Sequence, residues 1–585
     1  GFRESERIFE ATYALPTTQH AALEAHGCIA AVEAGGRIVV WSATQNPFVV
    51  RTQLANIFKV PVSRVRVAAP YLGGGYGSKV YPKLEPLAVA LALKARRPVR
   101  ILLTRDEVFL TITKHAATIR VKTGVKNDGT LVARQCEMLL DTGAYAEIGP
   151  RVAMKSGMTA AGPYRIPHVK VDALAVYTNK PPAGAFRGFG VSQSAWAIES
   201  QMDEIARALG IDPLEMRLKN AYEEGSEFVT GERLTSIGLK SCLERAAAAI
   251  GWADRAPQAT AGGKRRGKGI ACLIKGTITP SVSAAALRLS EDGSITLFTG
   301  TVEMGQGSET LLASIAATEL GIPLERVHVV AGDTDVVPYD LTTSSSRSTF
   351  HMGKAVQLAA RDLCLQLADI TAEEYGVPSP EVRFSQGKVR FGETTLEYGE
   401  VLFKRYGMPG GTIIGQGEVR TQTLVGPGEK MASVFWFVGA GAVEVEVNPD
   451  TGQLKIVNYA AAVDVGKAIN PQGCRQQLTG AAITGMGQAL YEELAFDDGR
   501  PVNANLIDYI LPSLGDMPGA MEAITVEVPH GQGPFGAKGI GETALIPVAP
   551  AIANAVQDAV GVRIKELPLT AEKVFFALQR ARKKA

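Results

Sequence analysis

Four short glycine clusters interrupt the hydrophobic pattern of this chain, and each stands between a strand-like segment and a helix-like segment. They occupy residues 73–77, 184–190, 303–307 and 536–541. Glycine adopts positive φ values readily and lets the backbone come close to a ligand. A helix that starts beside such a turn presents unpaired N–H groups and the positive end of its dipole, which favour anionic oxygen. Four such turns predict a large, oxygen-rich anionic ligand bound between domains.

The known nucleotide-binding motifs do not describe these clusters. None reads Gly-x-x-x-x-Gly-Lys-Ser/Thr, the phosphate-binding loop of many ATPases. None combines Gly-x-Gly-x-x-Gly with an acidic residue about twenty positions further on, as dinucleotide-binding folds do. The ligand is therefore predicted to be something other than ATP or NAD.

The length and the composition predict several globular domains. A chain of 585 residues exceeds what one hydrophobic core usually organises. Hydrophobic residues make up 46% and charged residues 21%, and a net charge of +2 gives no field that would attract nucleic acid. No apolar run approaches the length of about 18 residues that a membrane span needs, so no span is expected.

The cysteines and the first residues bear on redox environment and processing. The six cysteines are scattered without a Cys-x-x-Cys pair, which argues against zinc or an iron–sulfur cluster ligated within this chain. Isolated cysteines suit a reducing compartment, so the cytoplasm is the expected location. The sequence opens with Gly1 and shows no signal peptide, so we expect an upstream segment to be missing.

Hydrophobic periodicity predicts helices and strands mixed along the whole chain, an α+β fold. The expected strands of the first half are 38–41, 64–69 and 99–103, and its expected helices are 48–58, 84–95 and 192–209. The second half is expected to contain hairpins within 285–298 and 442–463, a strand at 327–330, and helices after residue 307 and at 350–375, 547–560 and 571–580. Asp292-Gly293 is a strong turn signal for the first hairpin.

The segment 253–269 is rich in Gly, Pro, Ala and basic residues, and we interpret it as a linker. The basic run that it contains is interpreted as a solvated surface rather than a nucleic-acid site. The prediction is therefore two elongated mixed α/β domains, at 1–252 and 270–585, with the ligand between them.

A series of segments runs through the whole chain in a recognisable order. It comprises residues 19–24, 42–46, 73–79, 97–100, 105–107, 185–190, 303–307, 464–466, 470–471 and 538–542. In this order they resemble the molybdopterin-binding large subunit of the molybdenum hydroxylases, the xanthine dehydrogenase and aldehyde oxidase family. The usual N-terminal domain of that family is missing, so we expect a truncated sequence or a separate chain that supplies it.

The resemblance implies a molybdenum–molybdopterin cofactor, expected in its cytosine dinucleotide form. The metal would be held by the pterin dithiolene and by no protein side chain. A 2Fe-2S subunit and an FAD subunit are expected as partners, in a cytoplasmic complex that is a dimer of hetero-oligomers. Neither nucleic acid nor a membrane is expected as a partner.

The resemblance assigns Glu542, at the end of Gly-Ala-Lys-Gly-Ile-Gly-Glu, as the catalytic base. Such a glutamate takes a proton from the metal-bound hydroxide, whose oxygen attacks an electron-poor carbon while hydride passes to the sulfido ligand. We expect Glu542 to open the helix at 547–560, where the helix dipole favours an ionised carboxylate. The alternative is a helix cap or a surface glutamate.

The resemblance also implies which residues surround the cofactor. They are Gln306, Gly305, Gly75, Tyr76, Gly77, Phe186, Arg187, Ser346, Arg347, Ser348, Thr349, Gly541, Gln19 and Gln477. Gln306 matches a glutamine at the pterin, and the hydroxyl-rich stretch 346–349 matches one at its phosphate. Structural alternatives stay open for these residues. Gln306 could be an ordinary turn glutamine, Arg187 could form a structural ion pair, and residues 346–349 could be a polar loop. Gln19 and Gln477 could be hydrogen-bonded structural glutamines.

Three residues are predicted to contact the substrate. Val80 stands where purine-oxidising members carry a glutamate, and Lys155 replaces their arginine, which weakens a strict xanthine assignment. Gly188 stands where carbon monoxide dehydrogenases carry a copper-binding cysteine, which argues against CO oxidation. Phe189 matches an aromatic residue that stacks on flat substrates, with core packing as the alternative.

The sequence therefore predicts molybdenum-dependent hydroxylation of a carbon in an N-heteroaromatic compound or an aldehyde. Water would supply the oxygen, and the electrons would pass to iron–sulfur and FAD subunits. Two alternatives remain, a reductive relative that acts on an aromatic acyl-CoA and a subunit that carries the cofactor without catalysis. The carboxylate at Glu542 argues against the carrier, which needs no base.

Overall fold

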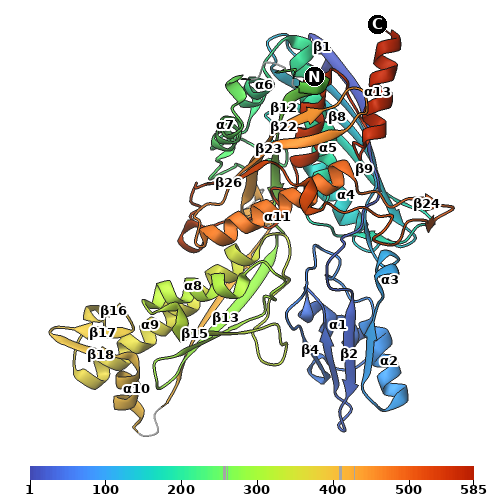
Figure 1. The fold of residues 1–585 in the computed structure, drawn as a ribbon. Helices are drawn as coiled ribbons and strands as arrows, with labels where there is room; N and C mark the ends of the chain where they lie inside the picture. Colours follow the sequence, from blue (N-terminus) through green and yellow to red (C-terminus); the bar gives the residue numbers. More distant parts are fainter. Residues whose placement is uncertain (255–257, 260, 408–410, 427–428, 585) are drawn as a thin grey trace.

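The computed structural model describes residues 1–254, 258–259, 261–407, 411–426 and 429–584 and shows an upper body with two lobes below it (Figure 1). Both termini lie in the upper body. One lobe comes from the N-terminal part of the chain, drawn in blue, and the other from its middle, drawn in green and yellow. Helices and strands occur in all three parts, so the predicted α+β fold is confirmed.

The N-terminal lobe is a four-stranded sheet packed with two helices. Its strands are β2 (Gly27–Val32), β3 (Ile38–Ser42), β4 (Val65–Ala68) and β5 (Val99–Leu102), in the order β4-β3-β2-β5. Its helices are α1 (Pro47–Phe58) and α2 (Glu85–Ala95). A small core that includes Val40, Leu54 and Val89 holds sheet and helices together. The strands and helices predicted here are confirmed, and β2 is additional.

The middle lobe repeats this arrangement at larger size. Its strands are β13 (Ser281–Leu289), β14 (Ile295–Thr299), β15 (Val327–Ala331) and β19 (Ile413–Thr421), in the order β15-β14-β13-β19. Helices α8 (Ser308–Leu320) and α9 (Gly353–Tyr375) form a core with them. A small sheet, β16 (Arg383–Ser385), β17 (Lys388–Phe391) and β18 (Thr394–Glu397), lies with α10 (Tyr398–Tyr406) at the outer end (Figure 1). The predicted antiparallel hairpin of β13 and β14 is confirmed.

The upper body contains two sheets and a buried central helix. One sheet has the order β1 (Arg7–Leu15), β7 (Ala117–Val125), β8 (Leu131–Gly143), β9 (His168–Tyr177). The other has the order β11 (Gln258–Ala259), β12 (Arg265–Gly276), β22 (Trp436–Val447), β23 (Leu454–Asp464), β26 (Ala520–Val526). Helix α5 (Val191–Leu209) packs against both sheets and against α12 (Val548–Val560). None of the described helices is long and apolar enough to cross a membrane.

The last five residues of the predicted linker at 253–269 belong to a strand of the upper body. Residues 255–257 and 260 of it lie outside the described residues, but β12 begins at Arg265 and pairs with β22 along its whole length. Its glycines serve close packing, because a Cβ on Gly267 or Gly269 would lie 2.3 Å or 2.1 Å from the α12 backbone. One hydrophobic core contains residues of both halves of the chain. The segment therefore does not separate two cores.

Candidate active site

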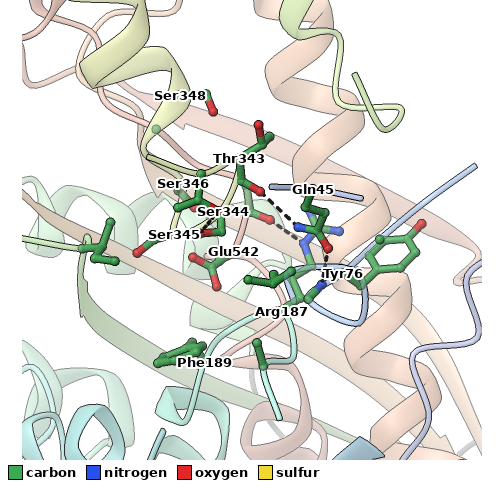
Figure 2. Close-up of a pocket in the computed structure, with 18 of the residues that line it drawn as sticks. Gln45, Tyr76, Arg187, Phe189, Thr343, Ser344, Ser345, Ser346, Ser348 and Glu542 are labelled. Atoms are coloured by element: carbon green, nitrogen blue, oxygen red, sulfur yellow. Dashed lines mark hydrogen bonds between the residues drawn. The ribbon is translucent and has the colours of Figure 1, made fainter. Parts of the chain in front are cut away.

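A cavity of ≈ 780 Å³ lies where the upper body meets both lobes. Its walls include residues within 45–49 and 75–81 of the N-terminal lobe, 304–312 and 341–349 of the middle lobe, and 148–159, 185–191, 275–278, 476–480 and 539–542 of the upper body. Figure 2 shows part of this lining. All four glycine clusters contribute to this one cavity, as the sequence predicts.

The clusters differ in how they meet the helices. Gly190 and Gly307 cap α5 and α8 directly, with φ values of 84° and 77°, whereas the other two clusters end several residues before a helix. At α8 the Glu303 carboxylate accepts hydrogen bonds from the N–H groups of Gly305 (2.8 Å) and Gly307 (2.9 Å). The prediction of free N–H groups is therefore wrong at this helix, because the chain's own carboxylate takes the place of an external anion.

Gln306 lines the cavity, but its side-chain amide is held within its own loop. Nε2 donates to the Val302 carbonyl (2.8 Å) and to the Ser308 hydroxyl (3.0 Å), and Oε1 accepts from the Met304 N–H (2.7 Å). Both amide N–H groups are thus used, and one lone pair of Oε1 is left for a ligand. The neighbouring Gly305 has φ of 96°, and a Cβ there would meet nothing within 4 Å. The backbone of this turn therefore offers the closer approach to a ligand.

Glu542 lies in the cavity wall, held by two groups from distant parts of the chain. The predicted position at a helix start is wrong, because α12 begins only at Val548 and the dipole effect fades within the first turn. Instead, the Lys275 Nζ lies 2.8 Å from Oε2, and the Gly188 N–H donates to Oε1 at 3.2 Å. The side chains of Lys275 and Glu542 are 4% and 13% exposed. A mostly buried ion pair therefore fixes the Glu542 carboxylate in the cavity wall.

The sequence prediction does not include Lys275. This residue follows the apolar run Cys272, Leu273 and Ile274 near the end of β12, and the whole residue is buried. A buried lysine needs an anionic or polar partner, so a lysine that continues an apolar strand is the signal that could have identified it.

Arg187 joins the first half of the chain to the second across the cavity. Its guanidinium donates to the Gly541 carbonyl and to the Gln477 Oε1 (2.9 Å), and its backbone N–H donates to the Tyr76 carbonyl (2.8 Å). Burial lowers the pKa of Arg187, while Tyr76 and Glu542 oppose that shift. The predicted residues Arg187, Gln477, Tyr76 and Gly541 thus form one connected group, and the ion-pair alternative for Arg187 is not what the structure shows.

Hydroxyl groups form the side of the cavity that lies across from Phe189. In Figure 2 the Glu542 carboxylate lies between these hydroxyl groups and the Phe189 ring. They belong to residues 342–349, and the Ser346 Oγ is buried and has no hydrogen-bond partner among the described residues. This segment runs directly against the Glu542 loop, since a Cβ on Gly539 would lie 1.7 Å from the Ser346 carbonyl oxygen. The predicted Ser346, Ser348 and Thr349 line the cavity together with Phe186, Gly75 and Gly77.

Gln45 connects the two lobes beside these groups. Its Oε1 accepts from the Gly77 N–H (3.0 Å), and its Nε2 donates to the Thr343 carbonyl (3.0 Å), as the dashed lines in Figure 2 show. The sequence prediction uses the segment 42–46 for the resemblance but assigns Gln45 no role. A glutamine that accepts a hydrogen bond within one lobe and donates one to the other lobe fixes the distance between the two walls.

Gln19 and Arg347 do not line the cavity, which corrects their prediction. Gln19 donates to the carbonyls of Val108 and Ile112, both at 3.1 Å, and is buried. Arg347 is fully buried in a 2.5 Å ion pair with Asp340. The hydroxyl-rich sequence around Arg347 does not reveal which way its side chain points, because Asp340 reaches it only through the fold of the middle lobe.

The three predicted substrate residues all lie in the cavity lining. Phe189 adopts φ of 42° in the loop before α5, and Val80 belongs to the N-terminal lobe. Lys155 lies on helix α4 (Gly149–Met158). Trp436, at the start of β22, also lines the cavity and has no counterpart in the sequence prediction. This end of the cavity is therefore bounded by aromatic rings and by a lysine.

Two family models match the chain, both described as molybdopterin cofactor-binding domains, over residues 1–221 and 245–518. The xanthine dehydrogenase molybdenum-binding subunit of Escherichia coli O157:H7 is 34% identical over 96% of this chain and 76% of its own length. The chain belongs to the molybdenum hydroxylase family. The predicted family and the oxidoreductase class are thereby confirmed.

Solved structures of molybdenum hydroxylases share this fold. Quinoline 2-oxidoreductase from Pseudomonas putida 86 gives a TM-score of 0.89 at 27% identity, covering 99% of this chain and 77% of that chain. Aldehyde oxidoreductase from Desulfovibrio gigas gives 0.87 at 27% identity, covering 99% of this chain and 62% of that chain. The chain therefore spans somewhat under two thirds of the Desulfovibrio protein.

The cavity suits the molybdopterin cofactor that the matched domains bind. Its hydroxyl-rich wall includes the unpartnered Ser346 Oγ, a donor of the kind that phosphate oxygens accept. The Gly305 turn leaves room for a ligand to approach the backbone, and Arg187 adds a buried positive charge. These groups would hold the pterin and its phosphate.

Proposed function

We propose that the chain catalyses the hydroxylation of a carbon atom in an N-heteroaromatic compound or an aldehyde, with Glu542 as the base. The bound cofactor supplies the two-electron oxidation, and water supplies the oxygen. The observation that carries the proposal is a single carboxylate in the cavity wall, between the hydroxyl-rich segment and the aromatic end (Figure 2). Of the Asp and Glu residues that the structure describes, Glu542 alone lines the cavity.

The surroundings of Glu542 suit a general base. The Lys275 ammonium and the Gly188 N–H each contact one oxygen of the carboxylate and so fix its position in the cavity wall. Its side chain is 13% exposed, which limits competition from bulk water. Phe189 and Trp436 provide flat apolar surfaces on which a planar substrate can lie.

The proposal extends to cofactor form, partners and location. We infer the cytosine dinucleotide form of molybdopterin, a 2Fe-2S subunit and an FAD subunit as electron acceptors, and a cytoplasmic dimer of hetero-oligomers. Similarity to proteins named for xanthine, aldehyde and quinoline substrates supports a small organic substrate. Val80 in place of the glutamate of purine-oxidising members favours a substrate other than xanthine.

The test replaces Glu542 by Gln, which keeps size and removes the base. We expect Glu542→Gln to retain molybdenum, measured by elemental analysis, and to lose nearly all turnover. Glu566→Gln, at an exposed glutamate paired with Lys573, is the matched control and should turn over normally. Full activity in metal-replete Glu542→Gln contradicts the proposed role. Product formed in ¹⁸O-labelled water separates hydroxylation from reduction of an acyl-CoA, because only hydroxylation incorporates the label.

A further inference from the structure

The substrate end of the cavity carries more positive than negative charge. Arg151 and Lys155 both line it from α4, where residues four apart lie on the same face of a helix. Lys275 approaches from β12, and its charge is balanced by Glu542. Among the residues that the structure describes, neither Arg151 nor Lys155 forms an ion pair with a carboxylate.

Glu232, which with Glu542 opposes the lowering of the Lys155 pKa, does not neutralise this pair. Glu232 lies near Lys155, but its carboxylate accepts hydrogen bonds from the Trp436 indole (2.5 Å) and from the Ala432 N–H. Burial raises the pKa of Glu232, which weakens it further as a counter-ion for a lysine. The positive charge on α4 therefore has no full partner in this part of the chain.

This arrangement costs folding free energy. Burial, together with the neighbouring charges of Lys275 and Arg151, lowers the pKa of Lys155 to about 8, while Glu232 and Glu542 oppose that shift. Like charges four residues apart on a helix repel each other, and a partly buried ammonium group lacks the hydration that it has in water. A bound anion would relieve both effects, because it favours the charged form of Lys155.

The cavity that these cations line also has aromatic residues in its walls. Phe189, Trp436 and Tyr81 line the same cavity. Burial raises the pKa of Tyr81, and the adjacent Arg151 guanidinium opposes that shift. A ligand here therefore meets ring faces along its body and two cationic groups at one edge. An arginine and a lysine on adjacent helical turns can together bind a carboxylate.

We propose that the substrate is a planar aromatic or heteroaromatic compound with a carboxylate, which pairs with Lys155 and Arg151 while the ring lies at the Glu542 end of the cavity. This inference rests on the proposed function and narrows its substrate class to organic acids. A neutral ring would leave the partly buried Lys155 without an anionic partner, whereas the exposed Arg151 keeps its hydration. A cationic substrate would be repelled by Arg151, Lys155 and Lys275 together.

The test compares acids with amides of the same shape in the purified holoenzyme. The pairs are nicotinate with nicotinamide and 4-carboxybenzaldehyde with 4-formylbenzamide. Binding of the first pair is measured by isothermal titration calorimetry, and kcat/KM of both pairs is measured with an artificial electron acceptor. We expect nicotinate to bind at least about tenfold more tightly than nicotinamide.

Three variants test whether Lys155 causes the preference for the acid over the amide. Lys155→Met should bring the acid-to-amide ratio of affinities close to one, and Lys155→Arg should keep most of the preference because it keeps the charge. Lys170→Met removes an exposed lysine on β9 that pairs with Asp172, outside the cavity, and should leave the ratio unchanged. This control separates a local contact from a general effect of net charge.

The two proposals fail in different ways. Equal affinity for nicotinate and nicotinamide would overturn the proposed pairing of a substrate carboxylate with Lys155 and Arg151, even if both aldehydes are oxidised. A preference for nicotinate that survives Lys155→Met would overturn it as well. If the holoenzyme binds the acid preferentially and Lys155→Met abolishes this preference, the result supports the carboxylate-binding site even if no compound is turned over. That absence of turnover counts against the proposed hydroxylation alone.

Discussion

Gly539→Ala is expected to separate the loop that carries Glu542 from the hydroxyl-rich wall at residues 342–349. The added Cβ would lie 1.7 Å from the Ser346 carbonyl oxygen, and real contacts of this kind do not fall below 3.0 Å. The two backbones must therefore move apart by about 1.3 Å, because the contact atom belongs to a backbone and cannot rotate away. Glu542 lies three residues further along the displaced segment. A misplacement of about 1 Å can reduce turnover about 100-fold.

The assay is turnover per bound molybdenum, with metal content and thermal unfolding measured on the same sample. We expect a loss of about 100-fold in kcat and a destabilisation of about 1–3 kcal/mol. The control is Gly531→Ala, the same exchange earlier in this segment, where a Cβ meets nothing within 4 Å. Normal turnover per molybdenum in Gly539→Ala would refute the reasoning, and so would an equal loss in Gly531→Ala.

Three further predictions follow from buried or shifted charges. Arg347→Met should lower the free energy of unfolding by about 3–5 kcal/mol, because it leaves the buried Asp340 carboxylate without its positive partner. Urea denaturation measures this loss, and a value below about 1 kcal/mol would contradict the prediction. Lys275→Met should reduce kcat with wild-type molybdenum content, because Glu542 loses its partner, and unchanged kcat would argue against that pairing. The preference for acids over amides should fall as pH rises through about 8, where free Lys155 loses its proton, and a ratio that stays constant from pH 7 to pH 10 would exclude Lys155 as the anion partner.

Much of the local structure was predictable because its causes are local. The hairpin of β13 and β14 follows from Asp292-Gly293 between alternating apolar residues, and α5 ends at Leu209, the last residue of the helix predicted at 192–209. The linker prediction at 253–269 missed that β12 begins at Arg265, because glycines and basic residues look alike in a loop and in a strand that packs closely on a helix. The glycines of β12 are explained by the close approach of the α12 backbone, and β12 and α12 lie far apart in the sequence.

The sequence by itself determined the family, the four turns around one cavity, and Glu542 as its carboxylate, because each depends on a short motif whose residues are neighbours. Only the tertiary structure decided what surrounds that carboxylate. Lys275 reaches Glu542 across 267 positions, and Gly188 reaches it across 354. Sequence spacing does not encode such contacts, because they depend on how whole sheets and lobes pack. The charge of the substrate end is decided in the same way, by which cations find a partner and which, like Lys155, do not.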